Sequence, residues 1–176
     1  MFIGTPLISE EQIQKKVREL AYKITRDYAN KDLLVIGILK GSFMFFSDLI
    51  RHINTPLKID FVIASSYQKD KSSGEVTIHY FPREELKNKD ILLVEDIIDT
   101  GISLQAIKEK ILSMNPSSLK ICVLLDKKER RVIDVPLDYV GFSIPNKFIV
   151  GYGLDYNEMF RNIPYITIFK KELKHV

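Results

Sequence analysis

The sequence predicts an α/β fold with a mostly parallel central sheet flanked by helices. Short apolar runs typical of buried strands alternate along the chain with stretches that keep helical spacing. A chain of 176 residues suits a single domain with one sizeable core. No internal repeat, low-complexity segment or linker divides it. Residues 1–176 are therefore predicted to form one domain.

The first predicted element is a helix that begins at Ser9. Ser9 and Gln12 match a capping box, in which the serine side chain accepts from the glutamine backbone and the glutamine side chain reaches back. Apolar residues from Ile13 to Tyr28 follow at helical spacing. The next two predicted elements are a buried strand and a helix, at residues 33–39 and 43–53.

A long hairpin is predicted next. Residues 57–67 begin with an alternation of apolar and polar side chains, and residues 76–81 return as a second strand. Between them the polar, turn-rich stretch QKDKSSGE at 68–75 predicts a mobile loop. The remaining predicted elements are a strand, a helix and three further strands, at residues 90–96, 103–115, 119–126, 137–144 and 165–170.

Composition excludes several classes of protein. A net charge of +3 is too weak to indicate nucleic-acid binding, although Lys127 to Arg131 is a dense basic run. The single cysteine, Cys122, excludes an intramolecular disulfide and fits a reducing compartment. No apolar stretch approaches the ~20 residues of a membrane span, and the N-terminus lacks signal-peptide features. We expect a cytoplasmic protein with neither nucleic-acid nor membrane partners.

Candidate site residues gather where predicted strands end. The apolar run Ile91–Val94 leads into two adjacent acids, Glu95 and Asp96. Lys40 and Lys127 also lie at predicted strand ends. Because ligands of open α/β sheets bind at the carboxyl ends of the strands, these side chains are expected to converge.

The stretch that follows the acids allows two interpretations. Asp99 to Ser103 opens a helix, and the free N–H groups there, with the hydroxyls of Thr100 and Ser103, form a phosphate cradle. A helix N-cap made by Asp, Thr or Ser is the simpler alternative. The acid pair is expected just past the sheet edge. It would bind a sugar diol or a metal, stabilise positive charge on a sugar ring, or be merely solvated.

The stretch VEDIIDTG resembles the phosphoribosyl-pyrophosphate (PRPP) signature of the type I phosphoribosyltransferases. That resemblance implies the type I fold, with a small hood subdomain from the N-terminal and C-terminal segments. It also implies that Glu95 and Asp96 hold the ribose hydroxyls and that Asp99 is the general acid/base near the purine N7. The implied 5′-phosphate loop consists of Asp99, Thr100, Gly101, Ile102 and Ser103.

The resemblance covers residues 5 to 170. Residues 33–51 are similar to the pyrophosphate-contacting segment of the 6-oxopurine branch, in which the Leu39–Lys40 peptide is commonly cis. This similarity implies pyrophosphate contacts from Lys40 and Gly41. The stretch at 138–166, which also resembles this branch, implies a further pyrophosphate contact from Arg161. The segment from 66 to about 80, with Ser66 and Tyr67 at its start, is similar to the branch's mobile active-site loop.

Residues 138–166 match the 6-oxopurine branch nearly residue for residue. The match implies that Phe148 stacks on the base, that the Ile149 backbone contacts its edge, and that Asp155 lies beside it. The stretch LLDKKERR at 124–131 matches the purine-side strand end of the same branch, which implies that Lys127 donates to O6 of the base. The implied Mg²⁺ ligands are Glu95, Asp96 and Asp155. Alternatives from the residues themselves remain: Lys40 solvated, Phe148 in the core, Asp155 capping a turn, Arg161 in a surface ion pair.

The implied reaction transfers 5-phosphoribosyl from PRPP to N9 of hypoxanthine, and of guanine as well, with Mg²⁺ as cofactor and a homodimer or homotetramer as the assembly. Strand register does not decide whether Lys127 or Lys128 contacts the base. Gly153 is expected to loosen the loop before Asp155, and this leaves the preference for guanine open. Two rival classes are a PRPP-binding regulator and a receiver-like phosphoacceptor domain. The purine-side segment argues against the first, and the mid-chain acid pair against the second.

Overall fold

The computed structural model describes residues 4–66, 76–83 and 85–170, and a six-stranded sheet forms its centre. Every predicted strand of that sheet is present, with ends that differ by one or two residues where they differ. The strand order is β4-β3-β2-β5-β6-β7. The strands are β2 (Leu33–Leu39), β3 (Leu57–Ser66), β4 (Val76–Tyr80), β5 (Asp90–Ile98), β6 (Ser118–Asp126) and β7 (Tyr139–Ser143).

The sheet is mostly parallel, as predicted. Strands β3, β2, β5, β6 and β7 pair in parallel, and only β4 runs antiparallel, against β3. The chain moves outward from β2 to β3 and from β5 to β6, so the order reverses between β2 and β5. Ligands of such sheets bind outside the carboxyl ends of the strands at this reversal.

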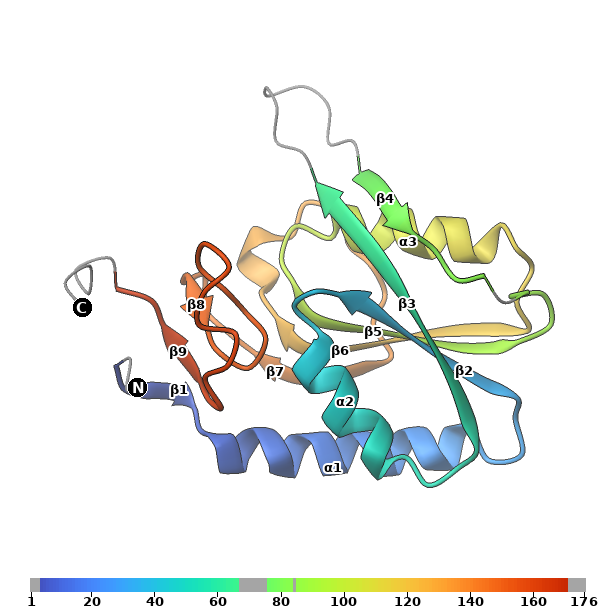
Figure 1. The fold of residues 1–176 in the computed structure, drawn as a ribbon, viewed down its shortest axis with the longest axis horizontal. Coiled ribbons are helices and arrows are strands. Elements are labelled where there is room, and N and C mark those ends of the chain that lie inside the picture. The colour runs from blue at the N-terminus through green and yellow to red at the C-terminus, as the bar shows by residue number, and fades with distance from the viewer. Residues whose placement is uncertain (1–3, 67–75, 84, 171–176) are drawn as a thin grey trace.

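Helices cover both faces of the sheet (Figure 1). α1 and α2 pack together on one face, and α3 lies on the other. Each face has its own cluster of buried apolar side chains, one around Phe45 and Leu49 and the other around Leu104 and Ile107. The helices are α1 (Glu10–Asp27), α2 (Phe43–His52) and α3 (Ile102–Leu112).

The predicted capping box is present at the start of α1. The backbone N–H of Gln12 donates to Ser9 Oγ at 3.3 Å, and the backbone N–H of Ser9 donates to Gln12 Oε1 at 2.8 Å. The predicted apolar face from Ile13 to Ile24 is buried. This reciprocal pairing satisfies donors that a helix N-terminus otherwise leaves open.

A second, three-stranded antiparallel sheet joins the two ends of the chain (Figure 1). Its order is β1-β9-β8, and β9 matches the predicted strand at 165–170. The sequence did not predict β1 or β8, because two or three residues are too few to show alternation. The strands are β1 (Pro6–Ile8), β8 (Ile149–Val150) and β9 (Ile166–Ile168).

The predicted hairpin is formed by β3 and β4. Ser66 ends β3 and Val76 pairs with it at the start of β4. Of the segment expected to be mobile, residues 76–80 form β4, and residues 67–75, with Tyr67 among them, lie outside the described residues. Among the helices of the described residues, none has the length and apolarity needed to cross a membrane.

Candidate functional site

The candidate site lies where β2 and β5 end. Lys40 and Gly41 follow β2 directly, and the Leu39–Lys40 peptide is cis, as the resemblance implied. Gly41 contacts the acid pair closely, since a Cβ built on it would lie 2.0 Å from Asp96 Oδ2. Only a glycine leaves room for this approach between the end of β2 and β5.

The acid pair belongs to β5 itself. Glu95 pairs with Val123 of β6, and the ladder continues to Ile98, so the prediction that the acids lie past the sheet edge is wrong. Side chains of adjacent strand residues point to opposite faces. Accordingly, Glu95 lines a cavity at the start of α3, and Asp96 contacts Gly41.

Asp96 is buried and Glu95 is half-buried, so both acids have little contact with solvent. Burial raises the pKa of Glu95 well above its usual range, and the neighbouring Asp96 charge raises it further. Burial also raises the pKa of Asp96. Within the described part of the chain, neither carboxylate forms an ion pair. A buried carboxylate without a cationic partner is costly, so the pair suits hydroxyl donors or a cation.

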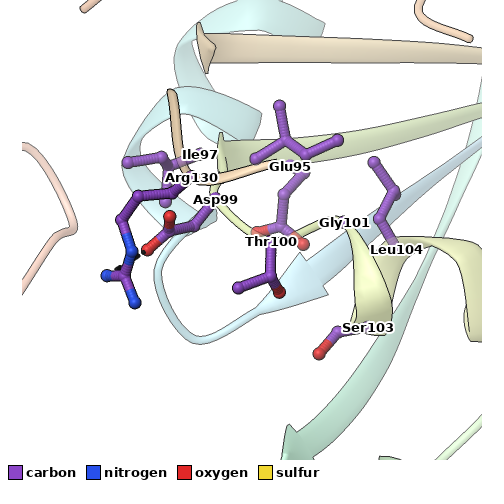
Figure 2. A pocket seen from close by; sticks show the side chains of 9 residues that line it. Glu95, Ile97, Asp99, Thr100, Gly101, Ser103, Leu104 and Arg130 are labelled. Carbon is purple, nitrogen blue, oxygen red and sulfur yellow. Dashed lines mark hydrogen bonds and ion pairs between the residues drawn. The ribbon is translucent and has the colours of Figure 1, made fainter. Parts of the chain in front are cut away.

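The turn from Asp99 to Ser103 forms a polar cavity of about 290 Å³ at the start of α3. Figure 2 shows Glu95, Thr100 and Ser103 among the side chains that line it. The helix begins after Gly101, whose φ is +85°, and no side chain caps it, which contradicts the simpler N-cap interpretation. A Cβ on Gly101 would lie 2.3 Å from the Ile133 carbonyl oxygen.

The N-terminus of α3 is consequently available to an anion. The first backbone bond of the helix joins the Gln105 N–H to the Gly101 carbonyl. Residues 102–104 therefore do not use their N–H groups within the helix. Thr100 Oγ1 accepts from the Ile102 N–H at 3.4 Å, a long contact. Free donors and the positive end of the helix dipole favour a phosphate here.

Asp99 meets two cations at the same edge of the cavity. Arg130 Nη1 donates to Asp99 Oδ2 at 2.9 Å, and Lys127 Nζ lies 3.7 Å from the same oxygen. Figure 2 shows the Arg130 side chain facing Asp99. The other oxygen, Asp99 Oδ1, is buried and has no hydrogen-bond partner among the described residues. A buried carboxylate oxygen without a partner is rare in folded proteins, and a proton donor from a ligand would satisfy it.

The structure separates Lys127 from Lys128. The Lys127 side chain is buried and lies beside Asp99, whereas Lys128 is exposed. The difference arises at the carboxyl end of β6. There the Lys127 N–H bonds to the Ile98 carbonyl, and a short 3-10 turn, Lys128–Arg130, begins one residue later.

Lys40 and Arg161 come together through acidic side chains. Glu158 Oε2 accepts from Lys40 Nζ at 3.0 Å and from Arg161 Nη2 at 3.3 Å. Arg161 Nη2 also lies 3.0 Å from Asp155 Oδ1, and its Nη1 donates to the Gly153 carbonyl at 2.8 Å. Lys40 is thus exposed but paired with Glu158. Arg161 is held at the site by several partners and does not form an isolated surface ion pair.

Phe148 and Ile149 stand where β8 begins. Phe148 is 55% exposed, so the core alternative is wrong for this residue. Its ring makes edge contacts with Tyr156 at 5.9 Å and with Phe169 at 6.0 Å between centroids. Ile149 is buried and pairs with Ile168 of β9. An exposed ring held by its edges is suited to stacking on a planar ligand.

Asp155 does not join the acid pair in this structure. The described residues contain no group of three or more Asp, Glu, His or Cys side chains placed to hold one metal ion. Asp155 Oδ2 accepts from the Glu158 N–H at 2.9 Å, so it caps the turn as the alternative interpretation held. Its other oxygen pairs with Arg161.

Gly153 is a point of close contact rather than a loose hinge. Its φ is +100°, and an added Cβ would lie 2.0 Å from the Gly41 carbonyl oxygen. Its N–H donates to the Arg161 carbonyl at 2.9 Å. The expectation that Gly153 loosens the loop is therefore wrong, because two contacts fix the backbone there.

Two residues of the site were not identified from the sequence. Arg130 belongs to the basic run at 127–131, and no spacing rule marked it as the partner of Asp99. Glu158 lies inside the segment that resembles the 6-oxopurine branch, yet its pairing with Lys40 joins residues 118 positions apart. Only the approach of separate loops could reveal either contact.

Comparison with known proteins places these features in one family. The family model described as phosphoribosyl transferase domain matches residues 8–157. A hypoxanthine-guanine phosphoribosyltransferase of Staphylococcus aureus strain N315 is 49% identical over 168 residues, which cover 95% of this chain and 94% of that protein.

Solved structures agree with the sequence comparison. A crystal structure of a hypoxanthine phosphoribosyltransferase from Staphylococcus aureus matches with a TM-score of 0.93 and 47% identity, covering 99% of this chain and 95% of that one. A hypoxanthine-guanine phosphoribosyltransferase from Bacillus anthracis matches with a TM-score of 0.89 and 46% identity, covering 97% of this chain and 100% of that one.

Proposed function

The chain belongs to the phosphoribosyltransferase family and has its type I fold, and on this premise we propose that it is a hypoxanthine-guanine phosphoribosyltransferase of purine salvage. It transfers the 5-phosphoribosyl group of PRPP to N9 of hypoxanthine or guanine and releases pyrophosphate. The observation that carries the proposal is the buried, unpartnered Asp99 Oδ1 beside Lys127 and the phosphate-ready start of α3.

PRPP binds along the carboxyl edge of β5. The loop from Asp99 to Ser103 takes the 5′-phosphate with the free N–H groups of α3 and the hydroxyls of Thr100 and Ser103. Glu95 and Asp96 accept hydrogen bonds from the ribose hydroxyls, and their charge favours the oxocarbenium-like C1′ that forms as pyrophosphate leaves. Lys40, the Gly41 backbone and Arg161 bind the departing anion.

Asp99 handles the proton of the base. Its Oδ1 accepts the proton at purine N7 while N9 attacks C1′, a contribution typically worth about 10²–10⁴-fold. Arg130 holds the other oxygen through a 2.9 Å contact, which fixes the direction of the carboxylate. Asp99→Asn is therefore expected to bind PRPP and to lose most of kcat.

Lys127 selects the base. Its ammonium group is only a donor, so it donates a hydrogen bond to O6 of hypoxanthine or guanine and opposes the 6-amino group of adenine, which is itself a donor. Phe148 stacks on the purine ring, the Ile149 backbone contacts the edge of the ring, and Asp155 lies beside the base. The burial of Lys127 next to Asp99 supports this choice over Lys128.

The carboxylates of the site fit a Mg²⁺ ion that is bound jointly by the protein and by the phosphates of the substrate. Mg²⁺ keeps near-octahedral oxygen coordination and is usually bound through one or two carboxylates together with substrate phosphates. Glu95 and Asp96 are adjacent carboxylates without an ion-pair partner in the described residues, and Asp155 lies beside the pyrophosphate cations. When bound, Mg²⁺ neutralises the charge of the pyrophosphate leaving group.

Two further parts complete the proposal. The small sheet β1-β9-β8 is the hood, which holds the base through Phe148 and Ile149. The segment that starts at Ser66 and Tyr67 closes over PRPP and excludes water, since water would otherwise hydrolyse it. The protein works in the cytoplasm as a homodimer or homotetramer.

Turnover of a panel of bases tests the proposal. The protein is incubated with PRPP, Mg²⁺ and each of hypoxanthine, guanine, xanthine and adenine, and nucleotide formation is followed by absorbance. Turnover of hypoxanthine and guanine without adenine is the expected result. Measurable PRPP binding without turnover of any base would instead identify a PRPP-binding regulator.

A further inference from the structure

Glu158 stands between the two cations that bind pyrophosphate. Its Oε2 lies 3.0 Å from Lys40 Nζ and 3.3 Å from Arg161 Nη2, so one carboxylate oxygen serves both groups. These three residues line a cavity of about 370 Å³ together with Leu39 and Phe43. The carboxylate therefore occupies the place where an anion meets both cations.

The backbone holds Glu158 in an unusual conformation. Tyr156 and Met159 exchange backbone hydrogen bonds of 3.1 Å, and the two residues between them have positive φ angles, 51° at Asn157 and 62° at Glu158. Turns of this kind favour glycine at the second central position, and a left-handed conformation costs an ordinary residue about 1–2 kcal/mol. A glutamate at this position, where glycine is favoured, points to a role for its side chain.

Glu158 does not use all the hydrogen-bond donors of Lys40 and Arg161. Arg161 Nε is buried and has no hydrogen-bond partner among the described residues. The Lys40 and Glu158 side chains are 66% and 65% exposed, so their contact is one that solvent and ligands reach. The hydrogen bond from Lys40, and then that from Arg161, lowers the pKa of Glu158, which keeps it charged at neutral pH.

We propose that Glu158 acts as an internal competitor that occupies the pyrophosphate position in the free protein and must be displaced by the diphosphate of the ligand. The inference rests on the proposed function and adds a residue that weakens ligand binding at the same site. Exposed ion pairs contribute little each, so a multiply charged diphosphate, which reaches both cations at once, displaces a single carboxylate.

The displaced carboxylate remains close to the bound anion. Because the turn at 156–159 is closed by two backbone hydrogen bonds, the Glu158 backbone stays in place, and the displaced carboxylate moves only as far as its own side chain reaches. Like charges still repel at such a separation. Glu158 thereby opposes retention of pyrophosphate and promotes its release. A residue that only positions Lys40 and Arg161 would have the opposite effect on affinity.

The decisive variant is Glu158→Gln, which keeps the size of the side chain and removes its charge. Calorimetry with magnesium pyrophosphate measures the dissociation constant, and pyrophosphorolysis of IMP measures KM for pyrophosphate. We expect both to fall about threefold to thirtyfold, since two exposed ion pairs and one repulsion are removed. Glu19→Gln is the control with the same change in net charge, because Glu19 pairs with Lys16 on α1.

A second variant separates direct competition from a general charge effect. Glu158→Asp keeps the charge but shortens the side chain by one methylene, so it no longer spans both contacts. Direct competition predicts tighter pyrophosphate binding in this variant too. An affinity equal to that of the unmodified protein would contradict direct occupation of the site.

The outcomes are distinguishable from those of the proposed function. Turnover of hypoxanthine by the unmodified protein establishes that function before any variant is compared. If turnover is present and Glu158→Gln binds pyrophosphate more weakly or equally well, the inference is wrong and the function stands. If the unmodified protein neither turns over a base nor binds pyrophosphate, both proposals fail.

Discussion

Substitution of Gly41 by alanine tests how the end of β2 is fitted to β5. The new Cβ would lie 2.0 Å from Asp96 Oδ2, 2.8 Å from Cγ and 3.1 Å from Oδ1, so it meets the whole carboxylate. Carbon–oxygen contacts below about 3 Å are strongly repulsive, and the two groups must separate by about 1 Å. The Ile97 N–H, which donates to Asp96 Oδ1 at 2.8 Å, opposes this movement.

Overpacking of this kind typically costs about 1–3 kcal/mol. For a chain of this length each kcal/mol lowers the melting temperature by about 2–4 °C, so a fall of about 2–12 °C is expected. Activity is expected to suffer more, because a displacement of about 1 Å in a positioned group costs about 100-fold. Melting curves and kcat/KM for PRPP measure the two effects separately.

A double-mutant cycle gives the control. Asp96→Ala removes the carboxylate, so Gly41→Ala in that background should lower the melting temperature by less than half as much. Equal losses in both backgrounds would mean that the strain lies elsewhere, and the reasoning from this contact would be refuted. An unchanged kcat/KM for Gly41→Ala would refute it as well.

Three further changes have defined outcomes. Lys127→Ala should raise KM for hypoxanthine about tenfold to a hundredfold, because a hydrogen bond from a charged donor is lost, whereas Lys128→Ala should leave it unchanged. The hydrogen bond from Lys120 lowers the pKa of Asp27, so its stabilisation is present above pH about 4 and is lost as pH falls through the folded-state pKa. The melting temperature of Lys120→Met should therefore approach that of the unmodified protein at acid pH, and a constant gap would contradict this. Ser9→Ala removes the capping box and should cost about 1 kcal/mol by chemical denaturation, with activity retained.

Periodicity predicted most of the fold because the elements are long enough to carry a pattern. The run at 33–39 is β2 without any change of boundary, and the capping box marks the start of α1. The pattern failed where an element is two or three residues long, as in β1 and β8. Strands as short as β1 and β8 form because β9 supplies their hydrogen-bond partners. A local pattern in the sequence does not show this pairing.

The candidate residues could be identified because they also form a local pattern in the sequence. Their arrangement in space could not be predicted from that pattern. The signature at 94–101 is contiguous, so its acids, its glycine and its threonine hydroxyl appear together in the sequence. The acid pair was placed past the sheet edge because charge is costly in a strand. The structure keeps both acids inside β5, since pairing with β6 continues to Ile98.

The sequence by itself determined the alternation of strands and helices, the polar turn at 99–103 and the set of charged residues, because these depend on neighbours along the chain. Tertiary structure alone decided that Lys127 rather than Lys128 meets Asp99, and that Glu158 pairs with Lys40. Such contacts join loops that follow different strands. They arise because parallel strands bring their carboxyl ends to one edge of the sheet. Residues that are far apart in the sequence lie close together in space there.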